Sequence, residues 1–206
     1  TKDECLDLPP MIYVKREVEL TRQQMKYYKL LKTKLIMNIT GEQITAMNSA
    51  VGMNKLLQIS AGAVYTDGGE TLEFDIQHRY KVLKEVIDES SKKVLVIRGD
   101  VSAPQRTVIF KQFQETNSPR VLVIQPQAAA HGVTLTAANT VVWWSPTSSL
   151  ETYAQANARV HRSGQTHKCT IVQLQGSSVE KHVYRLLDNK IDVHTKIIEL
   201  YKELLD

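Results

Sequence analysis

The sequence predicts an α/β fold in which helices cover both faces of a mainly parallel β-sheet. Two observations carry this prediction. Short apolar runs typical of buried parallel strands occur at 93–97, 121–124, 140–144 and 168–174. Longer segments with apolar residues at helical spacing separate most of these runs, as in strand–helix–strand units. We expect a helical segment before the first of these strands and a long C-terminal helix after the last.

The composition of the 206 residues bounds the class of protein. Apolar residues make up 42% and charged residues 23%, which is ordinary for a soluble globular protein able to bury a core. The net charge of +4 is compatible with nucleic acid but does not argue for it. Two cysteines, Cys5 and Cys169, are too few for a disulfide framework. No apolar run is long enough to span a membrane and no signal peptide is present, so we expect a soluble protein in a reducing compartment.

The elements before the first buried strand are predicted to be mostly helical. Residues 11–20 alternate apolar and charged side chains, as in a half-exposed strand. A capping box at Thr21–Gln24 begins a helix, and helical patterns return over 44–60 and about 75–90. Asp67-Gly68 marks a hairpin-like loop. The expected core positions of these helices are Met25, Tyr28, Leu31, Leu35, Met47, Val51, Leu56, Ile59, Ile76, Tyr80, Leu83 and Ile87.

Two further helices are expected in the second half of the chain. Ser102 can cap a helix that runs to about Glu115. Its inward positions are Val108, Ile109 and Phe113. A second capping box at Ser177–Glu180 begins a helix that is predicted to continue to about Leu205.

The segment from Glu151 to Gln165 holds the residues best suited to chemistry. Gln155, Arg159 and Arg162 stand at i, i+4 and i+7, so on a helix they share one face. Gly164 lies where a helix commonly ends in a left-handed residue. Each guanidinium can direct two N–H groups onto phosphate oxygens. By itself this pattern fits a phosphate site and a solvated basic helix end equally well.

This segment resembles the sixth motif of superfamily-two helicases. Its Gln-Ala-x-x-Arg-x-x-Arg-x-Gly-Gln form is similar to the Swi/Snf type in particular. The resemblance implies a RecA-like three-layer sandwich. It also implies that Arg159 and Arg162 reach the triphosphate of ATP bound on another lobe, with Arg162 as the arginine finger. Gln155 is then expected beside the nucleotide.

A second stretch, at 125–135, resembles the fifth helicase motif. It follows a buried strand, and its small residues allow backbone N–H groups to approach a ligand; a plain strand-to-helix turn is the alternative. The resemblance implies that Gly132 and Thr134 lie toward the nucleotide, and that Gln125 and Gln127 lie toward the DNA backbone. By resemblance alone, the Ala-His-Gly form of this motif and the Trp-Trp-Ser-Pro run at the end of the next strand favour a bacterial or phage source.

Other kinds of site find less support. The sequence has no Gly-x-x-x-x-Gly-Lys-Ser/Thr phosphate loop, and no strand ends in the Asp-Glu pair that would hold magnesium. The spacing of His131, His161 and His167 does not form a ligand set, so we predict no metal site. Trp143 and Trp144 are expected in the core, with stacking on bases as the alternative.

The resemblance divides the chain into four parts. These are a linker with a leading strand (1–20), a helical segment (21–74), the RecA-like core (75–176) and a C-terminal helix (177–206). Similar proteins place a strand–helix crossover between the strand at 93–97 and the following Gly-Asp turn, which here are adjacent. Either this unit is lacking or the sequence misses a segment. We favour the second, because losing the unit would expose apolar side chains of the neighbouring strand.

The resulting hypothesis is the second lobe of a Swi/Snf-type, DNA-dependent ATPase. ATP and Mg would be bound mainly by an N-terminal lobe outside this sequence, so the isolated chain is expected to be inactive. That lobe and duplex DNA are the expected partners, without a membrane, in a bacterial or phage-infected cytoplasm or in a eukaryotic nucleus. The alternatives are a non-enzymatic nucleic-acid-binding or scaffold module with a RecA-like fold, and a free-standing nucleotide-binding domain. A phosphate loop upstream of Thr1 would favour the first hypothesis.

Overall fold

The structure is a computed structural model that describes residues 8–39, 46–66, 68–97, 103–127, 133–196 and 199. The chain separates into two compact units, which we describe one at a time. Unit 1 comprises residues 1–16, 83–147 and 151–174, and unit 2 comprises 17–82, 148–150 and 175–206.

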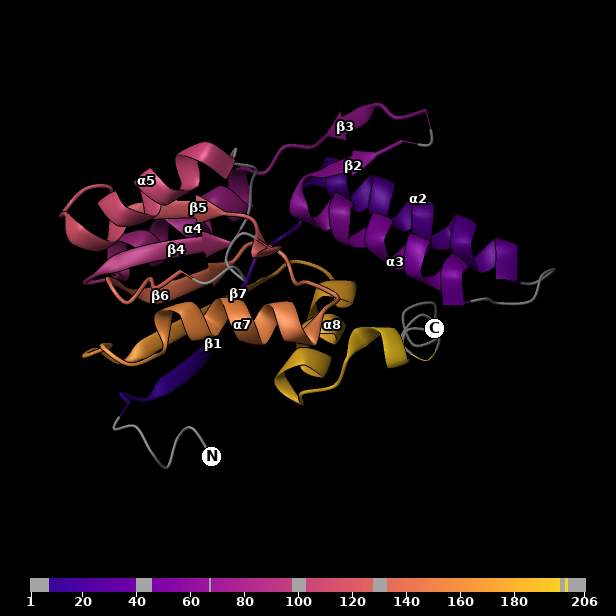
Figure 1. Cartoon of the computed structure of the whole chain (residues 1–206). Coiled ribbons are helices and arrows are strands. Elements are labelled where there is room, and N and C mark those ends of the chain that lie inside the picture. The colour runs from indigo at the N-terminus through magenta and orange to yellow at the C-terminus, as the bar shows by residue number, and fades with distance from the viewer. Residues whose placement is uncertain are drawn as a thin grey trace. The chain divides into compact units, whose positions relative to one another are not determined.

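Unit 1 is built on a five-stranded sheet with the strand order β1-β7-β6-β4-β5 (Figure 1). The strands are β1 (Met11–Glu17), β4 (Lys93–Ile97), β5 (Val121–Ile124), β6 (Ala138–Trp143) and β7 (Cys169–Gln175). β4 pairs in parallel with β5 and β6, and β6 pairs in parallel with β7. Ile97 lies opposite both Ile124 and Trp143, so the carboxyl ends of these strands share one edge. The predicted parallel sheet is confirmed.

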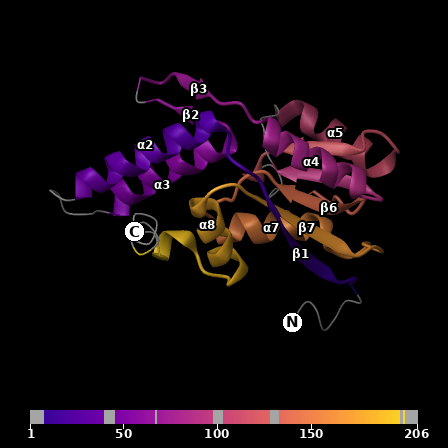
Figure 2. The ribbon, with the colours of Figure 1, turned by 180° about the vertical axis from the view of Figure 1, so that it is seen from behind.

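Helices lie on both faces of this sheet, as predicted. They are α4 (Gln77–Glu89), whose second half belongs to unit 1, α5 (Ala103–Glu115) and α7 (Leu150–Val160). α7 lies in front of the sheet in Figure 1, whereas α4 lies in front when the molecule is seen from behind in Figure 2. The strands between these helices are apolar and buried, which is the physical reason for their continuous apolar runs.

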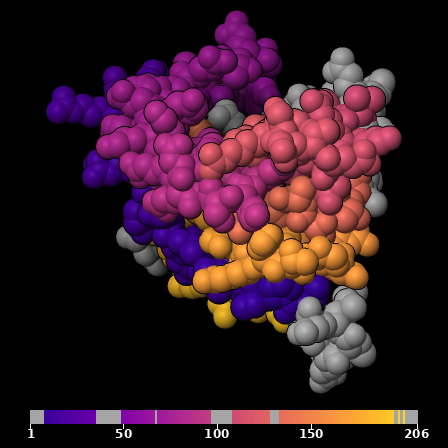
Figure 3. Space-filling view, turned by 90° about the vertical axis from the view of Figure 1, so that its left-hand side faces the viewer, coloured from indigo at the N-terminus to yellow at the C-terminus, as the bar shows by residue number. Residues whose placement is uncertain are grey.

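Some residues of β5 and α5, at the edge of unit 1, are less buried than predicted. β5 is an edge strand, and its Val123 is 44% exposed. On α5, Phe113 is buried as predicted, but the prediction for Val108 is wrong because its side chain is 68% exposed. The pink part of α5 is visible on the face shown in Figure 3. α5 itself supplies the crossover between β4 and β5. The adjoining Gly99-Asp100 turn and Ser102 lie outside the described residues.

Unit 2 is mainly helical. It contains α2 (Arg22–Ile39), α3 (Ala46–Ala61), the antiparallel pair β2 (Ala63–Tyr65) and β3 (Thr71–Glu73), α8 (Ser178–Asp188) and the 3-10 helix η1 (Val193–Lys196). α2 and α3 lie side by side in both ribbon views. The β2–β3 pair confirms the predicted hairpin-like loop, although Asp67 is outside the described residues.

The predicted helix faces of unit 2 are only partly right. Tyr28, Leu56 and Ile59 are buried as expected. Met25 and Val51 are exposed, and so is Tyr80 on α4. In unit 2, α4 buries Arg79 instead. This is possible because a buried carboxylate neutralises the charge of Arg79.

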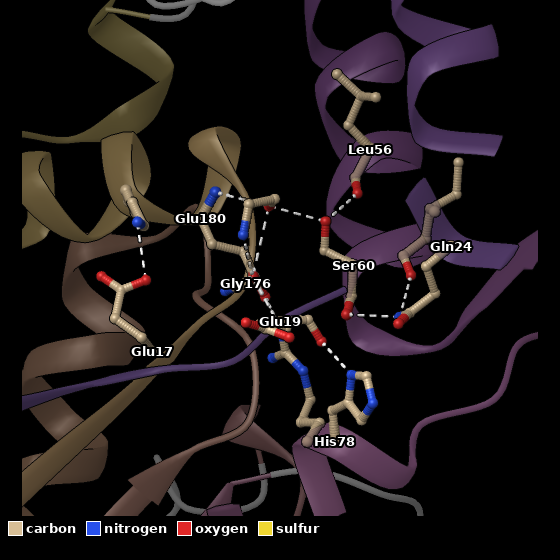
Figure 4. Close-up of polar contacts among 12 residues, drawn as sticks. Glu17, Glu19, Gln24, Leu56, Ser60, His78, Gly176 and Glu180 are labelled. Carbon is tan, nitrogen blue, oxygen red and sulfur yellow. Dashed lines mark hydrogen bonds and ion pairs between the residues drawn. The ribbon is translucent and has the colours of Figure 1, made fainter. Parts of the chain in front are cut away.

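That carboxylate is Glu180 on α8. The Arg79 Nη2 lies 2.8 Å from both Glu180 carboxylate oxygens, and the two side chains are 2% and 0% exposed. Glu180 also accepts hydrogen bonds from the N–H groups of Gly176 and Ser177, at 2.7 and 3.2 Å (Figure 4). The second predicted capping box is therefore confirmed and forms part of a buried ion pair.

The ends of the helices follow local chemistry. The first capping box is confirmed, with Gln24 N–H donating to Thr21 Oγ1 at 3.3 Å and Thr21 N–H donating to Gln24 Oε1 at 3.0 Å. α8 ends at Asp188 rather than near Leu205. The Asn189 Nδ2 donates to the Arg185 carbonyl at 2.7 Å, and Lys190 follows with a left-handed φ of 57°. These two residues turn the chain out of the helix.

Candidate functional site

The arginine segment lies in unit 1, at the end of α7. Gln155 and Arg159 are on the helix, one turn apart, whereas Arg162 lies two residues beyond its last residue, Val160. The predicted common helix face therefore holds for Gln155 and Arg159 only. Gly164 has the predicted left-handed backbone, with a φ of 94°, but the helix ends four residues earlier, at Val160. Arg162 is presented by a turn, so its position depends on what holds that turn.

Gln165 holds the turn that carries Arg162. Its side chain is 5% exposed, and its backbone N–H donates to the Arg162 carbonyl at 3.0 Å. Its Nε2 lies at 2.9–3.2 Å from three carbonyl oxygens, those of Thr136, Ala138 and Val160. Its Oε1 accepts from the His167 N–H at 2.9 Å. A single carboxamide thus joins the end of α7 to the start of β6.

The loop that resembles the fifth motif meets this turn. The Leu135 N–H donates to the Arg159 carbonyl at 2.9 Å, and the Leu135 side chain is buried. Thr134 precedes it and is exposed. This bond brings the backbone next to Thr134 close to that of Arg159, whereas a position of Thr134 toward the nucleotide stays a prediction. Gly132 lies outside the described residues.

The charged residues in the sequence around the two arginines, from 152 to 168, are all basic. Arg159 and Arg162 are both half-buried, rather than fully exposed. The segment 152–168 also contains Lys168 but no Asp or Glu. Within the described part of the chain, the Arg162 guanidinium forms no hydrogen bond or ion pair. Its N–H groups therefore remain available for an anion.

Gln155 has a partner of its own on α7. Its Nε2 donates to the Glu151 carboxylate at 2.7 Å, one turn earlier on the exposed side of the helix. The carboxamide would have to leave this bond, or share it, in order to contact a nucleotide. A role of Gln155 at the nucleotide stays a prediction.

The two predicted groups of site residues lie at opposite ends of the sheet. Gln125 and Gln127 directly follow β5, so they lie at the carboxyl edge of the parallel strands, where Gln125 is half-buried and Gln127 exposed. Arg162 lies at the other edge, because Gln165 binds the carbonyl of Ala138, the first residue of β6. Residues 125–135 connect one edge to the other.

Aromatic residues that were predicted to lie in the core hold α7 against the sheet. Trp143 and Trp144 are both buried, so the core prediction is confirmed for both. The Trp143 Nε1–H donates to the Asn157 side chain at 2.9 Å, and its ring lies 4.8 Å from the Tyr153 ring, centroid to centroid. These contacts fix α7 on the sheet, and with it the direction in which Arg159 leaves the helix.

Sequence reasoning missed the residues that position the site. The sequence indicates Gln165 only as part of a motif, and no sequence pattern indicates Asn157 or Gln114. Gln114 on α5 donates to Thr136 Oγ1 at 2.9 Å and accepts from the Ala137 N–H at 3.0 Å, which anchors the same loop from a second side. Polar residues inside otherwise helical patterns give no sign of burial, so no signal in a single sequence could have found these roles.

The described residues form no cluster that could hold a metal ion, and their one free cysteine is not a reactive nucleophile. Among them, no three His, Cys, Asp or Glu side chains are grouped so that they could hold a metal ion. Cys169 is a buried free cysteine, and burial raises the pKa of its thiol to about 11. The thiol is therefore neutral near pH 7 and unsuited to nucleophilic attack. None of the described helices is both long and apolar enough to cross a membrane.

Replacing Gln165 with leucine is expected to lower the free energy of unfolding of unit 1 by about 2–4 kcal/mol, because it leaves several buried backbone groups without a partner. Urea unfolding followed by tryptophan fluorescence measures this, since both tryptophans lie in unit 1. Gln155→Leu is the matched control, and its single exposed contact predicts a change below about 0.5 kcal/mol. Equal losses in the two variants would contradict the positioning role of Gln165.

Along most of its length this chain is similar to known proteins. The family described as helicase conserved C-terminal domain matches residues 55–164, more than half of the chain. The mouse (Mus musculus) chromodomain-helicase-DNA-binding protein 1-like is 29% identical over 153 residues, which cover 73% of this chain and 17% of that protein. The chain thus spans less than a fifth of the length of this relative.

Two solved structures share the fold. The C-terminal part of the Fun30 ATPase domain superposes with a TM-score of 0.73 at 17% identity, covering 97% of this chain and 98% of that one. The Sulfolobus solfataricus SWI2/SNF2 ATPase core in complex with dsDNA gives a TM-score of 0.69 at 21% identity, covering 96% of this chain and 49% of that one. At these identities the likeness establishes the fold alone.

Proposed function

This chain belongs to the helicase conserved C-terminal domain family, and from that premise we propose that it is the second RecA-like lobe of a Swi/Snf-type, ATP-dependent DNA translocase. The observation that carries the proposal is the Arg162 turn. Its backbone is held by Gln165, its side chain is half-buried, and no described residue neutralises its charge. A guanidinium without a partner among the described residues can bind an anion supplied from outside the chain.

The residues at this edge fit phosphate but not magnesium. Arg159 and Arg162 offer planar forks for phosphate oxygens, and Thr134 adds an exposed hydroxyl nearby. The segment 152–168 has no carboxylate that could bind a metal ion, and the 206 residues contain no phosphate loop. ATP with Mg would therefore be held mainly by a separate lobe. When bound there, it supplies the phosphoryl group that is transferred to water.

The proposed roles of the arginines follow from their positions. Arg162 extends from a turn and acts as the finger, stabilising negative charge as it develops on the transferring phosphoryl group. Arg159 emerges from the rigid helix beside it and orients the same phosphates. Gln155, one turn earlier, is proposed to contact the nucleotide after exchanging its bond to Glu151. Gly132 is proposed to bring backbone N–H groups close to the phosphates.

The opposite edge of unit 1 is proposed to hold DNA. The carboxamides of Gln125 and Gln127 can donate to backbone phosphates, which position a duplex without reading its sequence. Residues 125–135 connect this edge to the arginine edge, so a change in the nucleotide can alter the hold on DNA. Duplex DNA and the nucleotide-binding lobe are the proposed partners. A bacterial or phage source stays a prediction.

The isolated 206-residue chain is expected to hydrolyse no ATP above background, because it lacks a phosphate loop. Joined to a lobe that carries one, it is expected to gain Mg-dependent hydrolysis that duplex DNA stimulates. Steady-state phosphate release measures both. Robust turnover by the isolated chain would contradict the proposal. A joined protein that binds DNA but never hydrolyses ATP would instead support the alternative, a non-enzymatic scaffold with this fold.

A further inference from the structure

α2 carries an unbalanced positive charge that the proposed function does not use. Its 18 residues contain no Asp or Glu. Its basic residues are Arg22, Lys26, Lys29, Lys32 and Lys34. This charge of +5 on one helix exceeds the net charge of +4 on the whole chain. The neighbouring α3 adds Lys55 and again no acidic residue.

Three of these residues form a stripe along the exposed side of α2. Arg22, Lys26 and Lys29 stand at i, i+4 and i+7 and are all exposed. We call them the α2 stripe. From its first to its last residue the stripe rises by about 10 Å, at about 1.5 Å per residue. That is about the rise of three nucleotides along one strand of a duplex.

The opposite side of α2 is anchored, so the stripe has to face outward. Gln24 is buried, and its Nε2 donates to the carbonyls of Ile59 and Ser60 at 2.9 and 3.2 Å (Figure 4). One turn later, the Tyr28 hydroxyl lies 3.0 Å from the Ser178 Oγ. These bonds fix the rotation of α2 about its axis.

The α2 stripe also differs from an ordinary solvated helix face. None of its three cations forms a hydrogen bond or an ion pair through its side chain with any part of the chain that the structure describes. On α4, by contrast, the exposed Lys81 and Lys84 alternate with acidic residues such as Glu85 and Asp88. Mixed charges of this kind neutralise one another, whereas α2 itself carries no acidic residue that could do so.

We propose that the α2 stripe binds the phosphate backbone of duplex DNA, as a contact separate from that of Gln125 and Gln127. Charge complementarity selects a polyanion. The three cations lie along one side of a single helix over about 10 Å, which favours a stiff polyanion over a flexible acidic peptide. The contact is sequence-independent, because it reaches phosphates and not base edges. It extends the proposed DNA partner but does not depend on the role of Arg162.

The test compares two triple variants with the same change in charge. The stripe variant is Arg22→Gln, Lys26→Gln and Lys29→Gln; the control is Lys81→Gln, Lys84→Gln and Lys111→Gln, at exposed positions of α4 and α5. Fluorescence anisotropy with a short labelled duplex measures the affinity at salt concentrations from about 50 to 200 mM. Circular dichroism confirms that both variants fold.

The stripe variant is expected to bind duplex DNA at least about tenfold more weakly. Its slope of log affinity against log salt should be shallower by about 2 to 3, since three phosphate contacts are lost. The control should keep a slope close to that of the unchanged protein. Unchanged DNA binding by the stripe variant, or equal losses in both variants, would overturn the proposal. So would a stripe variant that loses binding to poly-glutamate but keeps DNA, which would identify an acidic protein as the partner.

Failure of the proposed function gives a different result from failure of this inference. Arg162→Ala should leave the anisotropy titration unchanged, because that residue acts on the nucleotide. If hydrolysis never appears in a joined protein but the stripe variant still loses DNA binding, the stripe contact stands and the motor proposal falls.

Discussion

Arg162→Ala, in a protein that carries both lobes, is expected to lower kcat by about a thousandfold or more. The affinity for ATP should change only by a modest factor. The reason is differential binding: the guanidinium interacts more strongly with the charge that develops on the transferring phosphoryl group than with ground-state ATP. Steady-state hydrolysis with saturating DNA, together with a nucleotide-binding titration, separates the two effects.

Three further variants sharpen this result. Arg162→Lys should rescue little, since an ammonium cannot reproduce the planar fork. Lys168→Ala removes an exposed positive charge from the same segment and should leave kcat nearly unchanged. Gln165→Leu should lower kcat by loosening the turn even where the protein remains folded. If Arg162→Ala spares DNA-stimulated hydrolysis but abolishes DNA binding, Arg162 is a backbone clamp and not a finger.

Glu180→Gln is expected to lower the free energy of unfolding of unit 2 by about 3–5 kcal/mol. The substitution keeps the size of the side chain but leaves the buried Arg79 cation without its countercharge. The N–H groups of Gly176 and Ser177 both donate to Oε2 of Glu180, so the amide can keep that acceptor only by directing its NH2 group at the Arg79 guanidinium. Urea unfolding followed by far-ultraviolet circular dichroism detects the loss of the helices of this unit.

An exposed ion pair in the same unit provides the control. Glu17 and Lys181 lie 2.8 Å apart with side chains 70% and 48% exposed, so Glu17→Gln should cost less than about 1 kcal/mol. The double variant Arg79→Met/Glu180→Leu should be more stable than Glu180→Gln, because it removes both buried charges together. Equal, small effects of Glu180→Gln and Glu17→Gln would contradict a stabilising role for the buried pair.

This ion pair also shows where sequence reasoning reached its limit. Strands such as β4 were predictable because a run of apolar residues has few other solutions in a soluble protein. The face of α4 was not: the pattern placed Tyr80 inward, but Tyr80 is 61% exposed and Arg79 is buried. A charged residue can be buried only where its partner lies, and that partner stands 101 residues away in the sequence.

The candidate site was predictable in part for similar reasons. The common face of Gln155 and Arg159 and the left-handed Gly164 are local properties, so the sequence indicated them correctly. The true end of α7 at Val160, and the support of the Arg162 turn by Gln165, depend on hydrogen bonds to the start of β6. Edge strand β5 illustrates the same limit. Its apolar run indicated burial, whereas its place in the sheet leaves Val123 exposed.

If Arg162 is the finger, it binds the transition state of phosphoryl transfer more tightly than it binds ATP. The affinity of the two-lobed protein for ADP with fluoroaluminate, which mimics the transferring phosphoryl group, tests this most directly. We expect Arg162→Ala to weaken binding of the mimic by about the same factor by which it lowers kcat, while ATP affinity is preserved. Equal losses for ATP and for the mimic, or unchanged binding of both, would contradict it.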